Sequence, residues 1–356
     1  MILDKSELAR MVSQGAFPAM DHANYDGSDF SGGKYGGAVF LHISFVGVNF
    51  SNSFLRECTF IECNLTGANL SGVDLTLANF IKCNLTEAVL TGACMVNTSA
   101  IDSQFASADF SGGDMRTAKL INPQMVGAKF TGMTLDITSF IKGNLSGADF
   151  TNSHLKQTIL IECDLSNIKI QKTRFELAVL EKPKLDNLVF AGMDLGMTQF
   201  RSASMTKCDF TGCNLKQTSF FKADLSQSRF DGAKAFSAIF QEANLTDCSL
   251  TKMDLEQATF DSANLTNANF SGSRLYAALL PKSNCENAVF TGCEMTYADL
   301  AHANLTKANM SNTSLYRTVL HEVIEEDTIW TGATKALALG TDPKRQAAEN
   351  WKPQYA

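Results

Sequence analysis

The pentads Ala68-Asn69-Leu70-Ser71-Gly72 and Ala148-Asp149-Phe150-Thr151-Asn152 show the pattern that decides the fold of this 356-residue chain. Each pentad has a large apolar residue at its centre, a small residue two positions earlier, and Asn or Asp in the gap. The centres fall at nearly every position divisible by five from Tyr25 to Trp330, without an insertion or deletion. A fixed short period is typical of a repeat architecture in which each unit stacks on its neighbours.

The direction of side chains turns this period into a coil. Residues two apart in an extended segment point the same way, so the small residue and the central residue both face inward. The last two residues of a pentad, as in Ser71-Gly72 or Thr211-Gly212, supply a corner, because Gly tolerates turn geometry. Four corners would close a coil of twenty residues. The central position lapses at only a few pentads, at Ala100, Ala235, Cys285 and Glu325.

The distribution of phenylalanine supports four sides per coil. When central residues are sorted by position modulo twenty, 18 of the 21 central Phe fall on two columns that face each other. One column includes Phe40, Phe60 and Phe80, and the other includes Phe110, Phe130 and Phe150. Coils of twenty residues would stack these rings in register, which favours this coil length over other simple lengths.

These pentads resemble those of the bacterial pentapeptide-repeat family from Tyr25 to Trp330. The resemblance implies an all-β solenoid, a right-handed quadrilateral β-helix with short helical caps. It would contain about fifteen twenty-residue coils stacked about 4.8 Å apart around a solid interior.

The two ends of the chain depart from the repeat. Asp4-Lys5-Ser6-Glu7 predicts a capping-box helix start, and Asp342-Pro343 predicts a second short helix. Caps of this kind would cover the open coil ends. The expected organisation is an N-terminal cap with a short helix at 1–24, a pentapeptide-repeat β-helix at 25–330, and a C-terminal cap or tail at 331–356.

The segment from Ile168 to Met193 is less regular than the rest of the repeat. Pro183 and Leu188 occupy inward positions that small residues hold elsewhere. We therefore expect a local bulge or bend in this segment.

Composition excludes several classes of protein. The net charge of -7 is mild, and neither an apolar run long enough to span a membrane nor a secretory signal is present, so a cytoplasmic bacterial protein without a membrane span is expected. The cysteines are interpreted as small core residues in a reducing compartment, because eight of the ten stand at the small inward position. These eight are Cys58, Cys63, Cys83, Cys163, Cys208, Cys213, Cys248 and Cys293.

The sequence predicts no catalytic, cofactor or metal site, and hence no enzyme. A catalytic set normally converges in a concave site built on loops, which this repeat lacks. Of the five histidines, only His302 and His321, one coil apart near Asp299 and Glu322, could approach each other. We interpret them as solvated surface residues rather than metal ligands. Acidic and basic residues are interleaved, so direct nucleic-acid binding is not expected.

An outward aliphatic ladder is the first non-random surface feature. It occupies the position after the centre in seven successive coils, and then ends at Glu181 and Arg201. Stacking of β-branched residues on one another would explain it, and so would a dimer interface, a partner groove or cover from the N-terminal helix. The ladder consists of Leu41, Ile61, Ile81, Ile101, Ile121, Ile141 and Ile161.

The second surface feature is a group of outward tyrosines and arginines near the C-terminal end of the repeat. Tyr and Arg are the residues that dominate binding hot spots, although single exposed aromatic residues are ordinary. We expect a protein-interaction site here, made of Arg274, Tyr276, Tyr297, Tyr316 and Arg317.

Together these features predict a non-catalytic protein–protein interaction scaffold that presents flat faces to a protein partner or to itself as a homodimer. One alternative is a DNA mimic that inhibits or protects a topoisomerase, as the family resemblance suggests, but the balanced charge disfavours it. The other alternative is an effector or accessory protein of a bacterial secretion system, with the termini carrying the delivery signal.

Overall fold

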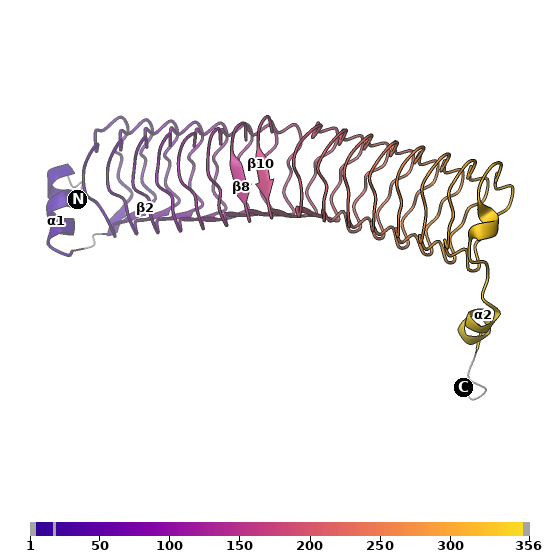
Figure 1. Ribbon diagram of the computed structural model, residues 1–356. Helices are drawn as coiled ribbons and strands as arrows, with labels where there is room; N and C mark the ends of the chain where they lie inside the picture. The colour runs from indigo at the N-terminus through magenta and orange to yellow at the C-terminus, as the bar shows by residue number, and fades with distance from the viewer. Residues whose placement is uncertain (1–4, 17–18, 352–356) are drawn as a thin grey trace. The chain divides into compact units, whose positions relative to one another are not determined.

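The chain folds as a parallel β-solenoid, described here from a computed structural model that covers residues 5–16 and 19–351 (Figure 1). It divides into two compact units, of which unit 1 ends at Leu185 and unit 2 begins at Asp186. This division falls inside the irregular segment that begins at Ile168. In the last coils of unit 1 the inward Ile168, Ile170 and Phe175 are 6–8% exposed, whereas Leu145 is fully buried. The expected bend stays a prediction.

The described residues of unit 1 form one helix and eleven short strands, each strand three residues long. The strands pair in parallel with a partner twenty residues away, as Phe60 of β3 does with Phe80 of β4. The elements are α1 Lys5–Ser13, β1 Ala19–Asp21, β2 Val39–Leu41, β3 Thr59–Ile61, β4 Asn79–Ile81, β5 Ser99–Ile101, β6 Lys119–Ile121, β7 Ser139–Ile141, β8 His154–Lys156, β9 Ile159–Ile161, β10 Arg174–Glu176 and β11 Val179–Glu181.

The register of the ladder confirms the twenty-residue coil. In unit 1, nine strands from β1 to β11 form one parallel ladder, and β8 pairs with β10 on another side. The sequence predicts about fifteen coils, more than the number of strands in this ladder. The difference arises because most coils of unit 2 are joined by single bridges, such as Asn244 with Asn264, rather than by strands.

Each corner is a hydrogen-bonded turn. In a typical corner the Met133 N–H donates to the Phe130 carbonyl at 3.1 Å, and Gly132 has a φ of 67°, as a type II turn requires. Where Asn or Asp stands before the centre, its side chain adds a hydrogen bond to the corner. At the corner after Leu70, for example, the Ser71 N–H donates to Asn69 Oδ1 at 3.1 Å. Many non-glycine residues also occupy the positive-φ position, including the β-branched Ile137 at 58°. The sequence rule that corners favour glycine is therefore weaker than expected.

The core lies along the inside of the coils, as the pattern predicts. Phe110, Phe130 and Phe150 are at most 3% exposed, and their rings stack in register with centroids 5.2 and 4.8 Å apart. The inward small residues are also buried, among them Ala68 and Ala148. The alternation of inward and outward side chains thus sets the core of both units.

Unit 2 repeats the coil and ends in two short helices. Its bridges include Asn244 with Asn264 and reach Leu339, and Leu320 is a buried central residue near its end. The elements are β12 Gln199–Arg201, a 3₁₀ helix η1 Lys335–Leu337 and α2 Pro343–Glu349. The Asp342 side chain caps α2 by accepting the backbone N–H groups of Lys344 and Arg345. This confirms the predicted helix after Asp342-Pro343.

The helix α1 lies at the end of unit 1 beside its first coil (Figure 1). Its Leu8 is 1% exposed. A nine-residue helix is about 14 Å long, so it is too short to cover an aliphatic ladder that extends over seven coils, about 29 Å. The predicted cap at Asp4 lies outside the described residues.

Candidate functional site

The aliphatic ladder forms one in-register row on unit 1. The outward residue of each strand faces its equivalent one coil away, as Ile61 faces Ile81 and Ile101 faces Ile121. All seven side chains are half-buried rather than exposed. Ile161 is then paired with Glu181, which ends the row. The contacts that the residues make with one another therefore account for much of their burial, as expected for cross-strand pairs of β-branched residues.

The tyrosines and arginines predicted from the sequence come together on unit 2. The ring centroids of Tyr276 and Tyr297 lie 5.6 Å apart, and those of Tyr297 and Tyr316 lie 5.8 Å apart, both edge to face. The Arg274 guanidinium lies 5.5 Å from the Tyr276 ring, and that of Arg317 lies 5.9 Å from the Tyr297 ring. These five residues form one continuous surface, which we call the tyrosine–arginine strip.

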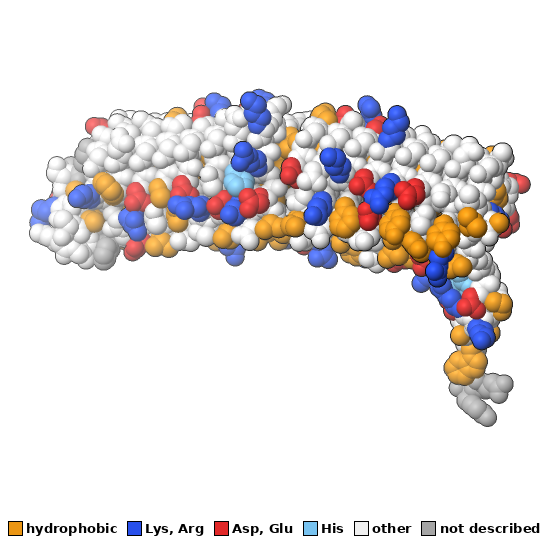
Figure 2. Space-filling model, in the orientation of Figure 1, with side chains coloured by type: hydrophobic (Ala, Val, Ile, Leu, Met, Phe, Trp, Pro, Cys, Tyr) orange, Lys and Arg blue, Asp and Glu red, His pale blue; other side chains and the backbone are white. Residues whose placement is uncertain are grey.

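Three members of the strip, Tyr297, Tyr316 and Arg317, are exposed, whereas Arg274 and Tyr276 are half-buried. Tyr297 is 44% exposed and Tyr316 is 47% exposed. Leu279, Leu337 and Leu339 are further exposed apolar side chains of unit 2. Figure 2 shows hydrophobic side chains gathered along the lower edge of unit 2 in this view, close to charged ones. An exposed apolar group of this kind is more than the single scattered residues that a soluble surface normally carries.

The two arginines of the strip have different surroundings. Arg274 is held by three acidic residues, Asp254 at 3.4 Å, Glu294 at 3.5 Å and Glu256 in closer contact. The hydrogen bond to Glu256 is the main cause that raises the pKa of Arg274. Arg317 has no ion pair within the described part of the chain. Its guanidinium is therefore the cation of the strip that can meet a carboxylate of a partner.

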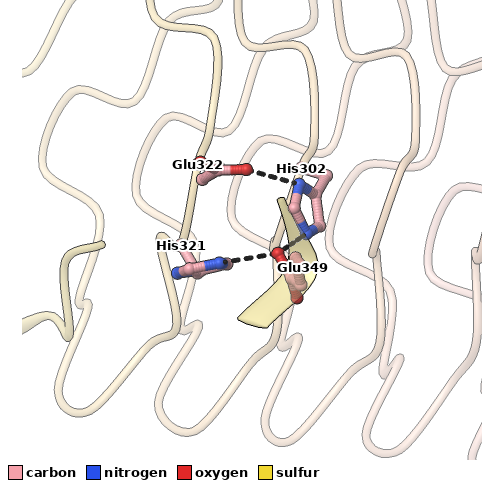
Figure 3. Close-up of side chains that lie close together, drawn as sticks. All are labelled: His302, His321, Glu322 and Glu349. Carbon is pink, nitrogen blue, oxygen red and sulfur yellow. Dashed lines mark hydrogen bonds and ion pairs between the residues drawn. The ribbon is translucent and has the colours of Figure 1, made fainter. Parts of the chain in front are cut away.

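A histidine–glutamate cluster lies at the C-terminal end of unit 2 (Figure 3). His302 Nε2 and His321 Nε2 lie 3.2 and 3.1 Å from Glu349 Oε2, and His302 Nδ1 lies 3.5 Å from Glu322 Oε2. The side chain of His321 is only 2% exposed. The interpretation as a solvated surface residue is therefore wrong for His321, whereas the side chain of His302 is 29% exposed.

Glu349 is the member of the cluster that the sequence did not reveal. It comes from α2, outside the repeat, and no period relates it to the histidines. The Arg345 Nε–H donates to Glu349 Oε1 at 2.7 Å. The hydrogen bond from Arg345, followed by that from His321, lowers the pKa of Glu349 to about 2. The carboxylate is therefore charged at neutral pH.

The cysteines lie where a structural role requires. All ten are free thiols, and the eight at the predicted inward positions are buried. Burial raises the pKa of the Cys58 thiol to about 12 and that of the Cys163 thiol to about 11. Thiols with such pKa values are almost fully protonated at neutral pH and make poor nucleophiles.

One hollow of about 390 Å³ opens on the side of unit 1 around Gly143. Two of its three lysines are paired with its two carboxylates, Lys182 with Glu162 at 3.3 Å and Lys184 with Asp164 at 3.6 Å. The third lysine, Lys142, leaves the hollow with one excess positive charge. The one thiol among its lining residues is Cys163, whose raised pKa makes it a poor nucleophile, and the lining includes neither a histidine nor a hydroxyl side chain.

Pentapeptide-repeat models match most of the chain. A model described as "Pentapeptide repeats (8 copies)" matches residues 23–60, 43–80, 63–99, 83–120, 144–176 and 279–321, and one described as "Pentapeptide repeat region" matches residues 203–280. No curated protein matches the sequence. Among the described residues, no helix is both long and apolar enough to cross a membrane.

Solved structures of other repeat proteins resemble this one only loosely. HetL of Nostoc sp. strain PCC 7120, a pentapeptide repeat protein involved in heterocyst differentiation regulation, is 18% identical, with a TM-score of 0.26 and coverage of 96% of this chain and 98% of HetL. QnrB1, a plasmid-mediated fluoroquinolone resistance protein, is 19% identical, with a TM-score of 0.32 and coverage of 55% and 92%. At these TM-scores the likeness carries no argument about function.

Proposed function

Because this chain belongs to the pentapeptide-repeat family, we propose that it is a non-catalytic interaction protein whose tyrosine–arginine strip binds a protein partner. The observation that carries the proposal is the continuous contact of three outward tyrosines with two arginines on one surface of unit 2, of which Tyr297, Tyr316 and Arg317 are exposed. Tyr and Arg supply large contact area, hydrogen-bond donors and charge at the centre of binding interfaces.

The surroundings of the strip indicate which chemistry a partner would offer. Tyr297 and Tyr316 present apolar ring area, and the exposed Leu279 is a further apolar side chain of unit 2. Arg317 offers a guanidinium that no acidic residue in the described ranges neutralises, whereas Arg274 is held in place by its acidic neighbours. We therefore expect a partner surface with apolar side chains next to a carboxylate.

The tyrosine–arginine strip is a better candidate for the partner-binding surface than the aliphatic ladder. All seven ladder residues are half-buried, whereas three of the five residues of the strip are exposed. Self-association through the ladder stays a prediction, and the pair Ile101→Asp and Ile121→Asp would test it by a change in oligomeric state. Delivery by a secretion system also stays a prediction.

The charges give no support to the alternative of DNA imitation. Lysines and acidic residues alternate along the coils and form ion pairs, for example Lys82 with Glu62 and Lys222 with Glu242. Figure 2 shows the same mixture of positive and negative side chains on the visible face. A mimic of a duplex needs a continuous negative surface.

Affinity capture with matched variants tests the proposal. The tagged chain, a Tyr297→Ala/Tyr316→Ala variant and a Phe54→Ala variant are each incubated with lysate of the source organism, and captured proteins are quantified. Phe54 is the control because it is 46% exposed and lies 5.9 Å from the Lys34 ammonium, but it belongs to unit 1.

The expected result is a protein that the unmodified chain and the Phe54→Ala variant capture equally and that the double variant loses. With the purified partner, each tyrosine substitution should weaken binding about tenfold or more, as for hot-spot residues. If the double variant captures the same proteins in the same amounts, the strip is not the binding surface.

A further inference from the structure

Three segments of unit 2 meet in the histidine–glutamate cluster. His302 lies on one coil, His321 and Glu322 lie on the next, and Glu349 is the last residue of α2 (Figure 3). The two coils are joined directly, because the His302 N–H donates to the His321 carbonyl at 2.8 Å. The two coils therefore determine the positions of His302, His321 and Glu322, and α2 supplies Glu349.

Hydrogen bonds determine the tautomer of His321. The backbone N–H of Asp342 donates to His321 Nδ1 at 3.1 Å, so this nitrogen carries a lone pair. The proton of the neutral ring is then on Nε2, which donates to Glu349 Oε2 at 3.1 Å. His321 thus acts as a donor that orients the carboxylate of Glu349.

His302 is in a different position, because both of its ring nitrogens face carboxylates. Nε2 lies 3.2 Å from Glu349 Oε2, and Nδ1 lies 3.5 Å from Glu322 Oε2. A neutral imidazole has one N–H donor and one lone pair. One lone pair would therefore face a carboxylate oxygen across a short distance, which is repulsive. A second proton or a metal ion can remove this conflict.

The carboxylates are oriented as ligands of a metal usually are. The amide of Gln346 donates to Glu322 Oε1 at 2.6 Å, and Arg345 donates to Glu349 Oε1 at 2.7 Å. The Oε2 atom of each carboxylate faces His302, and that of Glu349 also accepts the His321 Nε2–H. Outer hydrogen bonds that fix ligating carboxylates in this way are a regular feature of protein metal sites.

The separations between the donor atoms also fit a metal. Two ligands that each lie 2.0–2.1 Å from a tetrahedral Zn²⁺ are about 3.3 Å apart. His302 Nε2 and Glu349 Oε2 are 3.2 Å apart, close to this value, and one donor atom from each of the four residues can be chosen so that all lie within 4.8 Å of one another. Glu322 Oε2 lies 3.5 Å from the other ring nitrogen, Nδ1, so its side chain has to turn toward Nε2 to share the ion. Side-chain exposures of 27–34% for His302, Glu322 and Glu349 leave a path for an ion.

We infer that a divalent transition-metal ion of the Zn²⁺ class binds between His302, Glu322 and Glu349, with His321 as the residue that positions Glu349. The ion would neutralise the two carboxylates and accept one lone pair of His302. The imidazole ligand favours Zn²⁺ over Mg²⁺ and Ca²⁺, which prefer oxygen ligands alone.

The ion would fasten α2 to the end of unit 2. This helix has seven residues and none of them is buried, so apolar packing does not hold it in place. Its side-chain contacts to the coils run through Glu349 and Gln346. Metal binding would thereby fix the C-terminal segment that carries Trp351, which is 71% exposed. This inference does not rest on the proposed partner binding.

Calorimetric titration with Zn²⁺ tests the site in the untagged full chain after treatment with a chelator. All proteins carry His42→Ala, which removes a second group of possible ligands formed by Asp21, His22 and His42 in unit 1. The test variants are His302→Ala, Glu322→Gln and His321→Gln. The control is His154→Ala, because His154 pairs with Glu176 at 2.9 Å in unit 1 without α2.

We expect one Zn²⁺ per chain with equal affinity in the parent and the His154→Ala control. His302→Ala and Glu322→Gln should lower the affinity at least tenfold, and His321→Gln should lower it about 10–100-fold, as outer-shell substitutions do. Zn²⁺ should slow amide exchange of residues 344–349 in the parent but not in Glu322→Gln.

Two results would overturn the inference. One is Zn²⁺ binding that is as tight in His302→Ala and Glu322→Gln as in the parent. The other is amide exchange of α2 in the parent that Zn²⁺ leaves unchanged. Circular dichroism melting of each variant identifies any that fails to fold. Because Glu322→Gln is a conservative change at a partly exposed residue, we expect this variant to fold, so its Zn²⁺ affinity tests the site even if another variant does not fold.

Discussion

Replacing Phe130 by Ala should cost about 3–5 kcal/mol of unfolding free energy, the usual range for a buried phenylalanine. Phe130 is 0% exposed, and its ring stacks on those of Phe110 and Phe150 and meets Phe140 edge to face. The coils above and below are tied to this one by backbone hydrogen bonds, so they can collapse into the cavity only partly. The cost should therefore lie at the upper end of the range.

A second variant separates the stability lost with the ring contacts from the stability lost by creating a cavity. Phe130→Leu keeps most of the apolar volume but removes three aromatic contacts, each worth about 0.5–1.5 kcal/mol, so we expect a cost of about 2 kcal/mol. Phe54→Ala, at a site 46% exposed, serves as the control and should stay within about 0.5 kcal/mol of the parent.

Unfolding in guanidinium chloride, followed by circular dichroism, gives the stability of each variant. Repeat proteins often unfold in more than one step, so amide exchange in residues 120–140 should be measured as well. A cost below about 1 kcal/mol for Phe130→Ala would refute the solid aromatic core. Equal stability of Phe130→Leu and the parent would refute the contribution of ring stacking.

Two further predictions concern a corner and a carboxylate. Ile137→Asn should stabilise unit 1 by about 1 kcal/mol in thermal unfolding, because a β-branched residue at a φ of 58° is strained and Asn tolerates this conformation. An unchanged or lower stability of the variant would contradict this prediction. Partial burial raises the pKa of Asp231, but hydrogen bonds from Ser249 and Thr251 outweigh it and lower the pKa below 3.8. The stabilisation from Asp231 should therefore be present above about pH 4 and be lost as pH falls through the lower pKa of the folded state. Melting curves of the Asp231→Asn variant should lack this loss. The same acid dependence in both proteins would contradict the prediction.

The sequence identified much of the candidate surface because the repeat places outward residues in columns. Tyr276, Tyr297 and Tyr316 are spaced by nearly one coil, so their proximity could be predicted before their contacts were seen. The sequence also predicts the position of the aliphatic ladder around Ile101, but the half-burial of its side chains depends on how neighbouring side chains pack against one another. Column position alone does not give exposure.

The sequence by itself determined the twenty-residue coil, the inward positions and the aromatic columns, because these follow from a strict local alternation that every pentad repeats. Only the tertiary structure decided that Glu349 meets His302 and His321 and that His321 is buried. Those contacts depend on where a non-repeating helix docks. No period relates that helix to the coils, so the donors around the carboxylate of Glu349 become visible only when the chain is folded.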